Sequence, residues 1–200
     1  MILTAAVVIG LAAGLIRARK GKREFQVGSL RLWWLVILAY IPQWIAFSFP
    51  ATRNGFPDEL VPLVLIGSQI LLMIFAVANW KQAGFWLLGI GLFLNFLVIA
   101  INGGMMPISP ETVEGLLNGY PNVIWKIGER LGTGKDIILP ISETKLWFLS
   151  DRFLFPEWMP YRVAFSFGDT LIAVGAFWLL WSLGSPKQSM SKETRNVLHA

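Results

Sequence analysis

Apolar residues in this chain gather into five long runs separated by polar stretches. Each run approaches the roughly 20 residues that a helix needs to cross a bilayer. The runs cover residues 1–16, 32–49, 60–79, 84–101 and 163–183. This pattern predicts an all-α integral membrane protein with five transmembrane helices.

The polar stretches between the runs predict the rest of the organisation. We expect residues 1–183 to form a single transmembrane domain with an external segment at residues 102–162, followed by a tail at 184–200. Within the external segment, Ser109 and Pro110 are typical of a helix N-terminus, and residues 123–131 predict a second helical turn. The first run is short, since 16 residues rise only about 24 Å, and it would need a locally thinned bilayer.

Composition supports the membrane class and excludes several kinds of site. Of 200 residues 55% are hydrophobic and 14% are charged, whereas soluble domains carry about 25% charged residues. The chain has no cysteine and one histidine, His199. Disulfides, thiolate metal sites and iron–sulfur clusters are therefore excluded, and we expect neither a metal nor a cofactor.

Basic residues fix the predicted orientation. Positive charge follows the first run, returns at Lys81 and recurs in the tail, whereas the external segment shows no such bias. Because lysine and arginine accumulate on the cytoplasmic side of membrane proteins, the N-terminus is expected outside and the C-terminus inside. The net charge of +5 is thus explained by topology, and nucleic acid is not an expected partner.

Small and amide side chains within the runs are candidates for helix packing. Gly10 and Gly14 form a GxxxG motif, and Asn95 is an amide inside the fourth run. Such residues allow close helix contact and interhelical hydrogen bonds. The sequence Asn102-Gly103-Gly104 ends the fourth run. Its backbone either binds an anion or a lipid headgroup, or caps the helix before Pro107.

A carboxylate, Asp169, stands at the start of the last run, and two interpretations remain open. With Ser166 it can cap the helix, where the helix dipole favours negative charge. Alternatively, Asp151 lies beside it, so that two carboxyl groups share a proton as a general acid and base do. Further candidates for this site are Arg152, Arg162 and Glu157. If either arginine pairs with Asp169, the role of Asp169 is structural.

Two resemblances rest on these residues. The strings around Asn102–Ser109, Leu146–Asp151 and Phe165–Gly175 resemble a family of bacterial multi-pass membrane proteins of unknown function. That resemblance implies a protein of the bacterial cytoplasmic (inner) membrane and no particular activity. Separately, Ser150-Asp151-Arg152 with Ser166-Phe167-Gly168-Asp169 looks like the last-helix region of lipoprotein signal peptidases, which implies that Asp169 is half of an aspartyl dyad.

The leading hypothesis is a non-catalytic accessory or assembly subunit. Its expected partners are membrane lipids and another membrane protein or a second copy of itself, contacted through the external segment. The alternative is an aspartyl hydrolase or peptidase at the outer membrane surface, with Asp151 and Asp169 as its catalytic pair. A transporter is disfavoured because the runs show no internal repeat and no charge lies at the middle of any of them.

Overall fold

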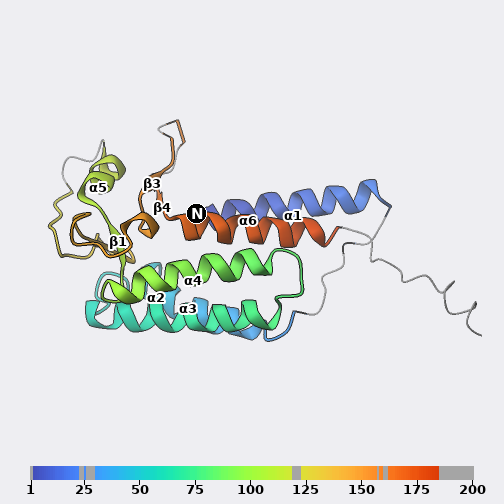
Figure 1. The fold of residues 1–200 in the computed structure, drawn as a ribbon, viewed down its shortest axis with the longest axis horizontal. Coiled ribbons are helices and arrows are strands. Elements are labelled where there is room, and N and C mark those ends of the chain that lie inside the picture. Colours follow the sequence, from blue (N-terminus) through green and yellow to red (C-terminus); the bar gives the residue numbers. More distant parts are fainter. Residues whose placement is uncertain are drawn as a thin grey trace, which may run out of the picture.

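Five long helices dominate the structure, a computed structural model that describes residues 2–22, 25, 30–118, 123–156, 158–159 and 162–184 (Figure 1). Each forms within one of the predicted apolar runs, give or take a turn. They are α1 (Ile2–Lys20), α2 (Trp34–Phe47), α3 (Val61–Ala78), α4 (Phe85–Ile101) and α6 (Phe167–Ser182). The predicted tail and the candidate Glu157 lie outside the described residues, apart from the first residue of the tail, Gly184.

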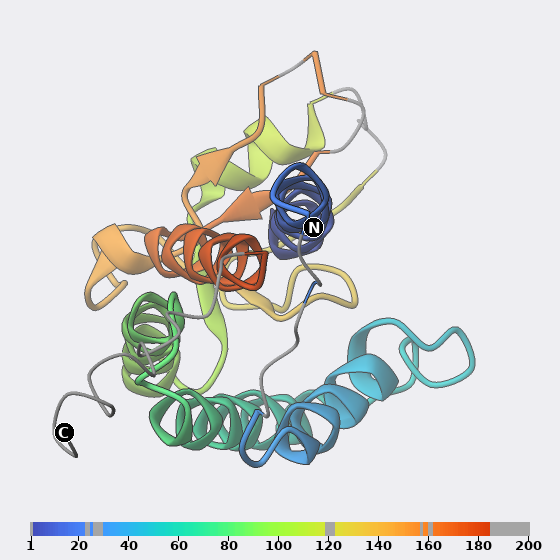
Figure 2. The same cartoon turned by 90° about the vertical axis from the view of Figure 1, so that its right-hand side faces the viewer.

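The helices stand side by side in an open arc. Viewed along their axes, the order is α1, α6, α4, α3 and α2, and each contacts the next (Figure 2). The first and second helices in the sequence therefore form the two ends of the arc. Its concave side is the feature that matters for the candidate site.

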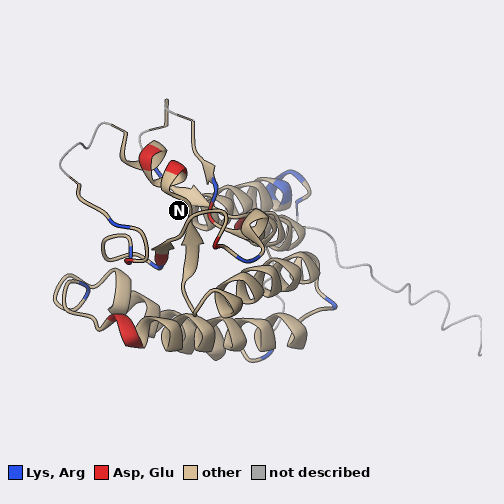
Figure 3. Cartoon of the chain, turned by 60° about the vertical axis from the view of Figure 1, so that its left-hand side comes forward, with Lys and Arg blue, Asp and Glu red and all other residues tan. Residues whose placement is uncertain are grey.

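Along the direction of the helix axes, the two ends of the bundle differ in charge (Figure 3). Where α1 and α3 end, the described residues 17–22, 30–34 and 79–84 include six basic and no acidic side chains; we call this the basic end. The opposite end, where α1, α3 and α6 begin, carries residues 48–60 and 102–166; we call it the covered end. Acidic side chains, mixed with basic ones, occur only here among the residues described.

Two helices are long and apolar enough to cross a membrane by themselves. They are α1, with 19 residues, and the continuous stretch Asp58–Ala78, with 21 residues, in which the 3-10 turn η1 (Asp58–Leu60) leads into α3. The first helix is thus longer than the predicted 16 residues, since it continues through its basic last turn to Lys20. The other three long helices are apolar but shorter, at 14, 17 and 16 residues.

Glycines let the central helices approach closely. On α4 and α6, which run antiparallel, Gly84 lies against Gly175 and Gly91 against Gly168, and a Cβ at any of the four would overlap the neighbouring helix. The GxxxG glycines of α1 meet the other side of α6, where a Cβ on Gly10 would lie 3.0 Å from the Cα of Phe177. The GxxxG face is therefore occupied within the chain.

The covered end is built from short elements around a small core. Strand β1 (Met106–Ile108) pairs in parallel with β2 (Asp136–Ile138), and β3 (Phe153–Leu154) pairs with β4 (Ala164–Phe165). The predicted helix after Ser109 is α5 (Pro110–Leu117), and Ser109 accepts the capping hydrogen bond from Thr112 N at 3.2 Å. A short turn, η2 (Trp147–Leu149), precedes β3.

The predicted helical turn at residues 123–131 is absent from the described part of that stretch. Gly128 has a φ of +82°, and its N–H binds Ile138 O at 2.8 Å. Leu131 N binds Asp136 O in the same way, also at 2.8 Å. Pairing with the β2 segment therefore overrides local helix propensity, and it brings the turn at Gly132–Lys135 over the arc.

Candidate functional site

A cavity of about 200 Å³ lies on the concave side of the arc. All five long helices contribute to its wall, and one further residue, Lys135, reaches it from the covered end. Most of the wall is apolar. The lining residues are Ile2, Leu3, Gln43, Leu65, Gln69, Leu72, Leu92, Asn95, Ile99, Lys135, Asp169 and Ile172.

Five polar side chains interrupt this apolar wall: Gln43, Gln69, Asn95, Lys135 and Asp169. The carbonyl oxygen of Gln69, Oε1, is buried and has no hydrogen-bond partner among the described residues. A buried acceptor left unpaired costs about 1–3 kcal/mol, so its place on a cavity wall needs an explanation. A hydrogen-bond donor in the cavity would supply one.

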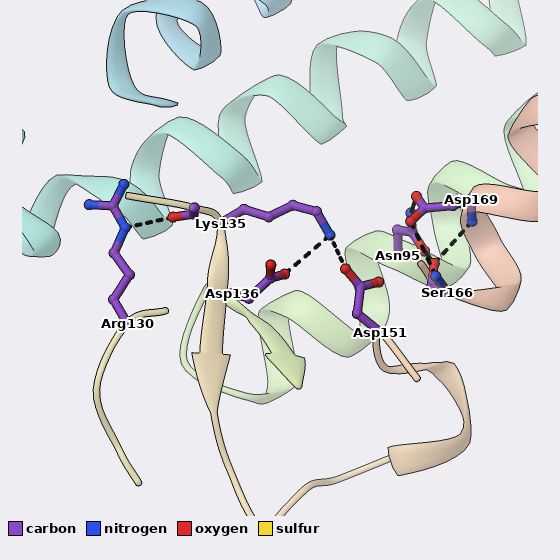
Figure 4. Close-up of polar contacts among 8 residues, drawn as sticks. Asn95, Arg130, Lys135, Asp136, Asp151, Ser166 and Asp169 are labelled. Carbon is purple, nitrogen blue, oxygen red and sulfur yellow. Dashed lines mark hydrogen bonds and ion pairs between the residues drawn. The ribbon is translucent and has the colours of Figure 1, made fainter. Parts of the chain in front are cut away.

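At one side of the cavity Asn95, Ser166 and Asp169 form a closed ring of hydrogen bonds (Figure 4). Asn95 Nδ2 donates to Asp169 Oδ1 at 2.7 Å, and Ser166 Oγ donates to Asn95 Oδ1 at 2.9 Å. Asp169 N donates to Ser166 Oγ at 3.0 Å, and Asp169 Oδ2 accepts from Ser166 N at 3.2 Å. Ser166 and Asp169 thus make the capping box of α6.

Lys135 enters from the opposite direction and lies between two carboxylates (Figure 4). Its Nζ is 2.5 Å from Asp151 Oδ2 and 3.4 Å from Asp136 Oδ1. Strand β1 makes this arrangement, because Met106 N binds Lys135 O on one side while Asp151 N binds Pro107 O on the other, both at 3.1 Å.

The charges in this group act strongly on one another. Burial raises the pKa of Asp151 well above its ordinary value, Asp136 and Asp169 raise it further, and Lys135 only partly opposes them. Burial by itself would lower the pKa of Lys135, but the three carboxylates outweigh it and the pKa is raised. The lysine therefore stays charged near neutral pH, while Asp151 tends to hold a proton.

The structure brings Asp151 and Asp169 into one electrostatic group without a direct hydrogen bond between them. Neither candidate arginine pairs with Asp169: Arg152 stacks 4.5 Å over the Trp147 ring, and Arg162 donates to Gly115 O at 3.3 Å. Asp151 is 1% exposed and does not line the cavity. Among the residues that the structure describes, no group of acidic or histidine side chains is placed to hold a metal ion.

The Asn102-Gly103-Gly104 sequence has a structural role in this fold. Gly103 has a φ of +87°, and Gly104 N binds Ile99 O at 2.8 Å, which closes α4 in a Schellman motif. The side chain of Asn102 binds Lys145 through both its N and O atoms. Gly104 N–H and the Asn102 amide are thus used in a helix cap that anchors the covered end, which is one of the two predicted roles of this sequence.

Comparison with known proteins places most of the chain in one family. A family of unknown function, DUF5317, matches residues 28–181. The chain belongs to the DUF5317 family. A relative from Thermotoga maritima, described as an uncharacterized protein, is 27% identical over 139 residues, which cover 66% of this chain and 69% of that protein. No solved structure matches the chain.

The DUF5317 region contains every cavity-lining residue except Ile2 and Leu3, which belong to α1. Sequence reasoning found Asn95, Ser166 and Asp169 but missed Lys135. The Gly132-Thr133-Gly134-Lys135 string lacks the spacing of a phosphate loop, and no periodic pattern marks its lysine. The side chain of Lys135 reaches the arc only because β2 pairs with β1, although α5 and residues 118–135 separate these two strands in the sequence.

Proposed function

We propose that this DUF5317 protein is a five-span membrane protein that binds an amphiphilic, lipid-class molecule in the arc cavity. The observation that carries the proposal is the cavity wall itself: it draws on all five long helices, is mainly apolar, and holds the unpaired acceptor of Gln69. The role is binding rather than catalysis, in line with an accessory membrane protein.

Three properties support the membrane assignment. Two helices are long and apolar enough to span, and the other three lie beside them in the same arc. The short segments at the basic end carry six basic and no acidic side chains among the described residues, which is the bias of short cytoplasmic loops that the positive-inside rule describes. Outward-facing side chains of α2 and α3, including Leu38 (50% exposed), Leu63 (70%) and Val77 (69%), would face lipid in a bilayer but water in a soluble protein.

The polar groups select the kind of ligand. The ammonium of Lys135 already faces three acidic side chains, Asp136, Asp151 and Asp169. An anionic headgroup gains little at such a site, whereas an amine or hydroxyl donates to Asp169 or Gln69 Oε1. Drug-sized pockets measure about 300–1,000 Å³, so a cavity of about 200 Å³ takes the head of the molecule and the start of its apolar part.

Native mass spectrometry of protein purified from membranes in mild detergent tests this proposal. Wild-type protein is expected to carry a lipid-mass adduct that is missing from Leu72→Trp, in which the new side chain fills the cavity. Leu63→Trp is the matched control, since Leu63 lies on the same helix but is 70% exposed. Bare wild-type protein, or a set of adducts in Leu72→Trp that is identical with that of wild-type protein, would contradict the proposal.

The expected accessory or assembly role adds a protein partner to this picture. We propose that the covered end presents the contact surface, because exposed Ile124 (89%) and Trp158 (80%) lie there. A pull-down in mild detergent is expected to return a second membrane protein or a second copy. Recovery of monomer alone would leave ligand binding as the whole role.

One observation favours a second candidate, the aspartyl hydrolase. Asp151 has a raised pKa and feels the charge of Asp169, as an acid of a catalytic pair does. Its burial, its ion pair with Lys135 and the capping bonds of Asp169 favour a structural role instead. Asp151→Asn is expected to keep adduct binding, because Asp151 does not line the cavity; loss of a hydrolytic activity in both Asp151→Asn and Asp169→Asn, with folding intact, would establish the enzyme.

A further inference from the structure

A second hollow lies at the basic end, far from the cavity polar groups, where α3 turns into α4. It measures about 220 Å³ and is more polar than the arc cavity in the residues that line it. Those residues are Arg31, Ala78, Asn79, Trp80, Lys81 and Gln82. Nothing in the proposed ligand binding uses them.

This hollow is held in shape by one buried amide. Asn79 is 3% exposed. Its Oδ1 accepts from Arg31 N at 2.9 Å and its Nδ2 donates to Arg31 O at 2.8 Å. A second bond from Nδ2 reaches Phe75 O at 2.9 Å. The chain before α2 is therefore fixed beside the α3–α4 turn, which sets Arg31 next to Lys81.

The charge of the hollow is positive and uncompensated within the described part of the chain. No described carboxylate lies within ion-pair distance of Arg31 or Lys81. The helix dipoles oppose one another at this hollow, because α2 and α4 begin at this end while α3 ends there, so the positive charge comes from the two side chains. The side chains of Arg31 and Lys81 and the Trp80 indole supply only hydrogen-bond donors, which suits a phosphate group.

An apolar hollow of about 410 Å³ continues from the polar one along α3, and Ala78 belongs to both. Its lining residues recur at helical spacing and make a single stripe: Ile70, Met73, Ile74, Val77 and Ala78. The stripe differs from the α3 face that lines the arc cavity, which carries Leu65, Gln69 and Leu72. It therefore points out of the arc, where an acyl chain would lie.

We propose that the basic end binds an anionic glycerophospholipid of the adjacent leaflet. Its phosphate contacts the side chains of Arg31 and Lys81, and one acyl chain follows the Ile70–Ala78 stripe. The positive charge of the hollow selects a lipid with an anionic headgroup, and the adjoining apolar hollow accommodates its acyl chain. This site is independent of the ligand in the arc cavity.

Native mass spectrometry of delipidated full-length protein, titrated with phosphatidylglycerol or phosphatidylcholine of identical chains, tests the headgroup. Wild-type protein is expected to prefer phosphatidylglycerol at least tenfold, and the pair Arg31→Gln with Lys81→Gln is expected to remove the preference. The matched control, Arg53→Gln with Lys145→Gln, removes the same charge at the covered end and is expected to keep it. Equal affinity of wild-type protein for the two lipids would overturn the proposal.

Two further arms separate a lipid from a free phosphate. Val77→Trp, which fills the stripe, is expected to weaken phosphatidylglycerol binding about tenfold, whereas Leu63→Trp on the same helix leaves it unchanged. Soluble glycerol 3-phosphate is expected to compete poorly. If it binds as tightly as the lipid, or if Val77→Trp has no effect, the site takes a soluble anion and the lipid assignment is wrong. Leu72→Trp, which fills the arc cavity, leaves this binding unchanged.

Discussion

Asn95 donates a hydrogen bond to Asp169 at 2.7 Å, although the two residues are 74 positions apart. The bond joins the last turns of α4 to the first turn of α6, at the contact where Gly91 faces Gly168. Because a Cβ on Gly168 would overlap Asn95, the glycine and the amide depend on each other. The same residues thus make the close contact between α4 and α6 and the polar part of the cavity wall.

Replacing Asn95 with leucine is expected to destabilise the protein by about 1–3 kcal/mol, because Asp169 and Ser166 each lose a partner in a buried setting. Thermal unfolding in detergent measures this. Asp169→Asn keeps an acceptor for the Asn95 amide, so its effect should be smaller than that of Asp169→Ala. Equal effects of the two Asp169 variants would show that the ring contributes nothing.

The close contact of α4 with α6 predicts opposite effects for two glycine substitutions. A Cβ on Gly91 would lie 2.6 Å from Gly168 O and 2.9 Å from Ile172 N, so Gly91→Ala is expected to cost about 1–3 kcal/mol. Gly67, on α3, has nothing within 4 Å of its Cβ position. Gly67→Ala should therefore be neutral or raise stability by up to about 1 kcal/mol. The unfolding temperatures of the two variants in one detergent provide the measurement.

Removing the ammonium of Lys135 is expected to destabilise the fold, because Asp151 is 1% exposed and its Oδ2 loses the hydrogen bond from Lys135 Nζ. A buried polar group left without its partner costs about 1–3 kcal/mol, which is the loss expected for Lys135→Met. Lys145→Met, an exposed lysine of the same segment, is the control. Urea unfolding that does not distinguish the two variants would contradict the ion pair.

The raised pKa of Asp151 predicts a pH dependence with a definite sign. In the folded protein this carboxyl holds its proton at a pH where the unfolded chain, with a pKa near 3.8, has lost it. Its contribution is thus fully favourable below that value and is lost as the pH rises toward the folded pKa. Lys135, whose pKa is also raised, changes only at alkaline pH.

The difference in unfolding free energy between wild-type protein and Asp151→Asn isolates this group. Taking the difference in unfolding free energy removes the pH dependence that comes from the carboxyl groups common to both proteins. The difference should fall steadily from pH 4 toward neutral pH. A difference that rises over the same range would mean that Asp151 is held ionised by Lys135.

Topology can be measured directly because the chain has no cysteine of its own. Single cysteines at Glu143, on the covered end, and at Lys81, on the basic end, are both exposed positions. On intact cells an impermeant maleimide should label Glu143→Cys and not Lys81→Cys, and both should react after lysis. The reverse pattern would invert the proposed orientation.

Hydropathy predicted the five long helices because burial in lipid or against apolar neighbours needs continuous apolar runs. The capping function of Ser166 and Asp169 was also visible locally, since a capping box spans four residues. The glycine pairs carry a signal as well: Gly84 and Gly91 are seven residues apart, as are Gly168 and Gly175. That spacing repeats two turns of helix and marks one face.

The covered end could not be predicted in the same way. Its strands are three and two residues long, too short for a periodic pattern. Residues 123–131 have helix-like apolar spacing, yet they pair with the segment at Asp136–Ile138. The position of Lys135 follows from that pairing, and so does its contact with Asp151. The sequence offered Arg152 or Arg162 as a partner for Asp169, whereas Arg152 lies over the Trp147 ring and the cation of this group is Lys135.

The extent of the family match gives α1 a distinct place in the fold. The match begins at residue 28, after α1 ends, and α1 docks on the rest through Gly10 and Gly14 against α6. Without α1 the cavity would lack the part of its wall that Ile2 and Leu3 provide. In this chain α1 acts as a side wall, and the fit of its two glycines on α6 would decide how far a molecule in the cavity is shielded from its surroundings.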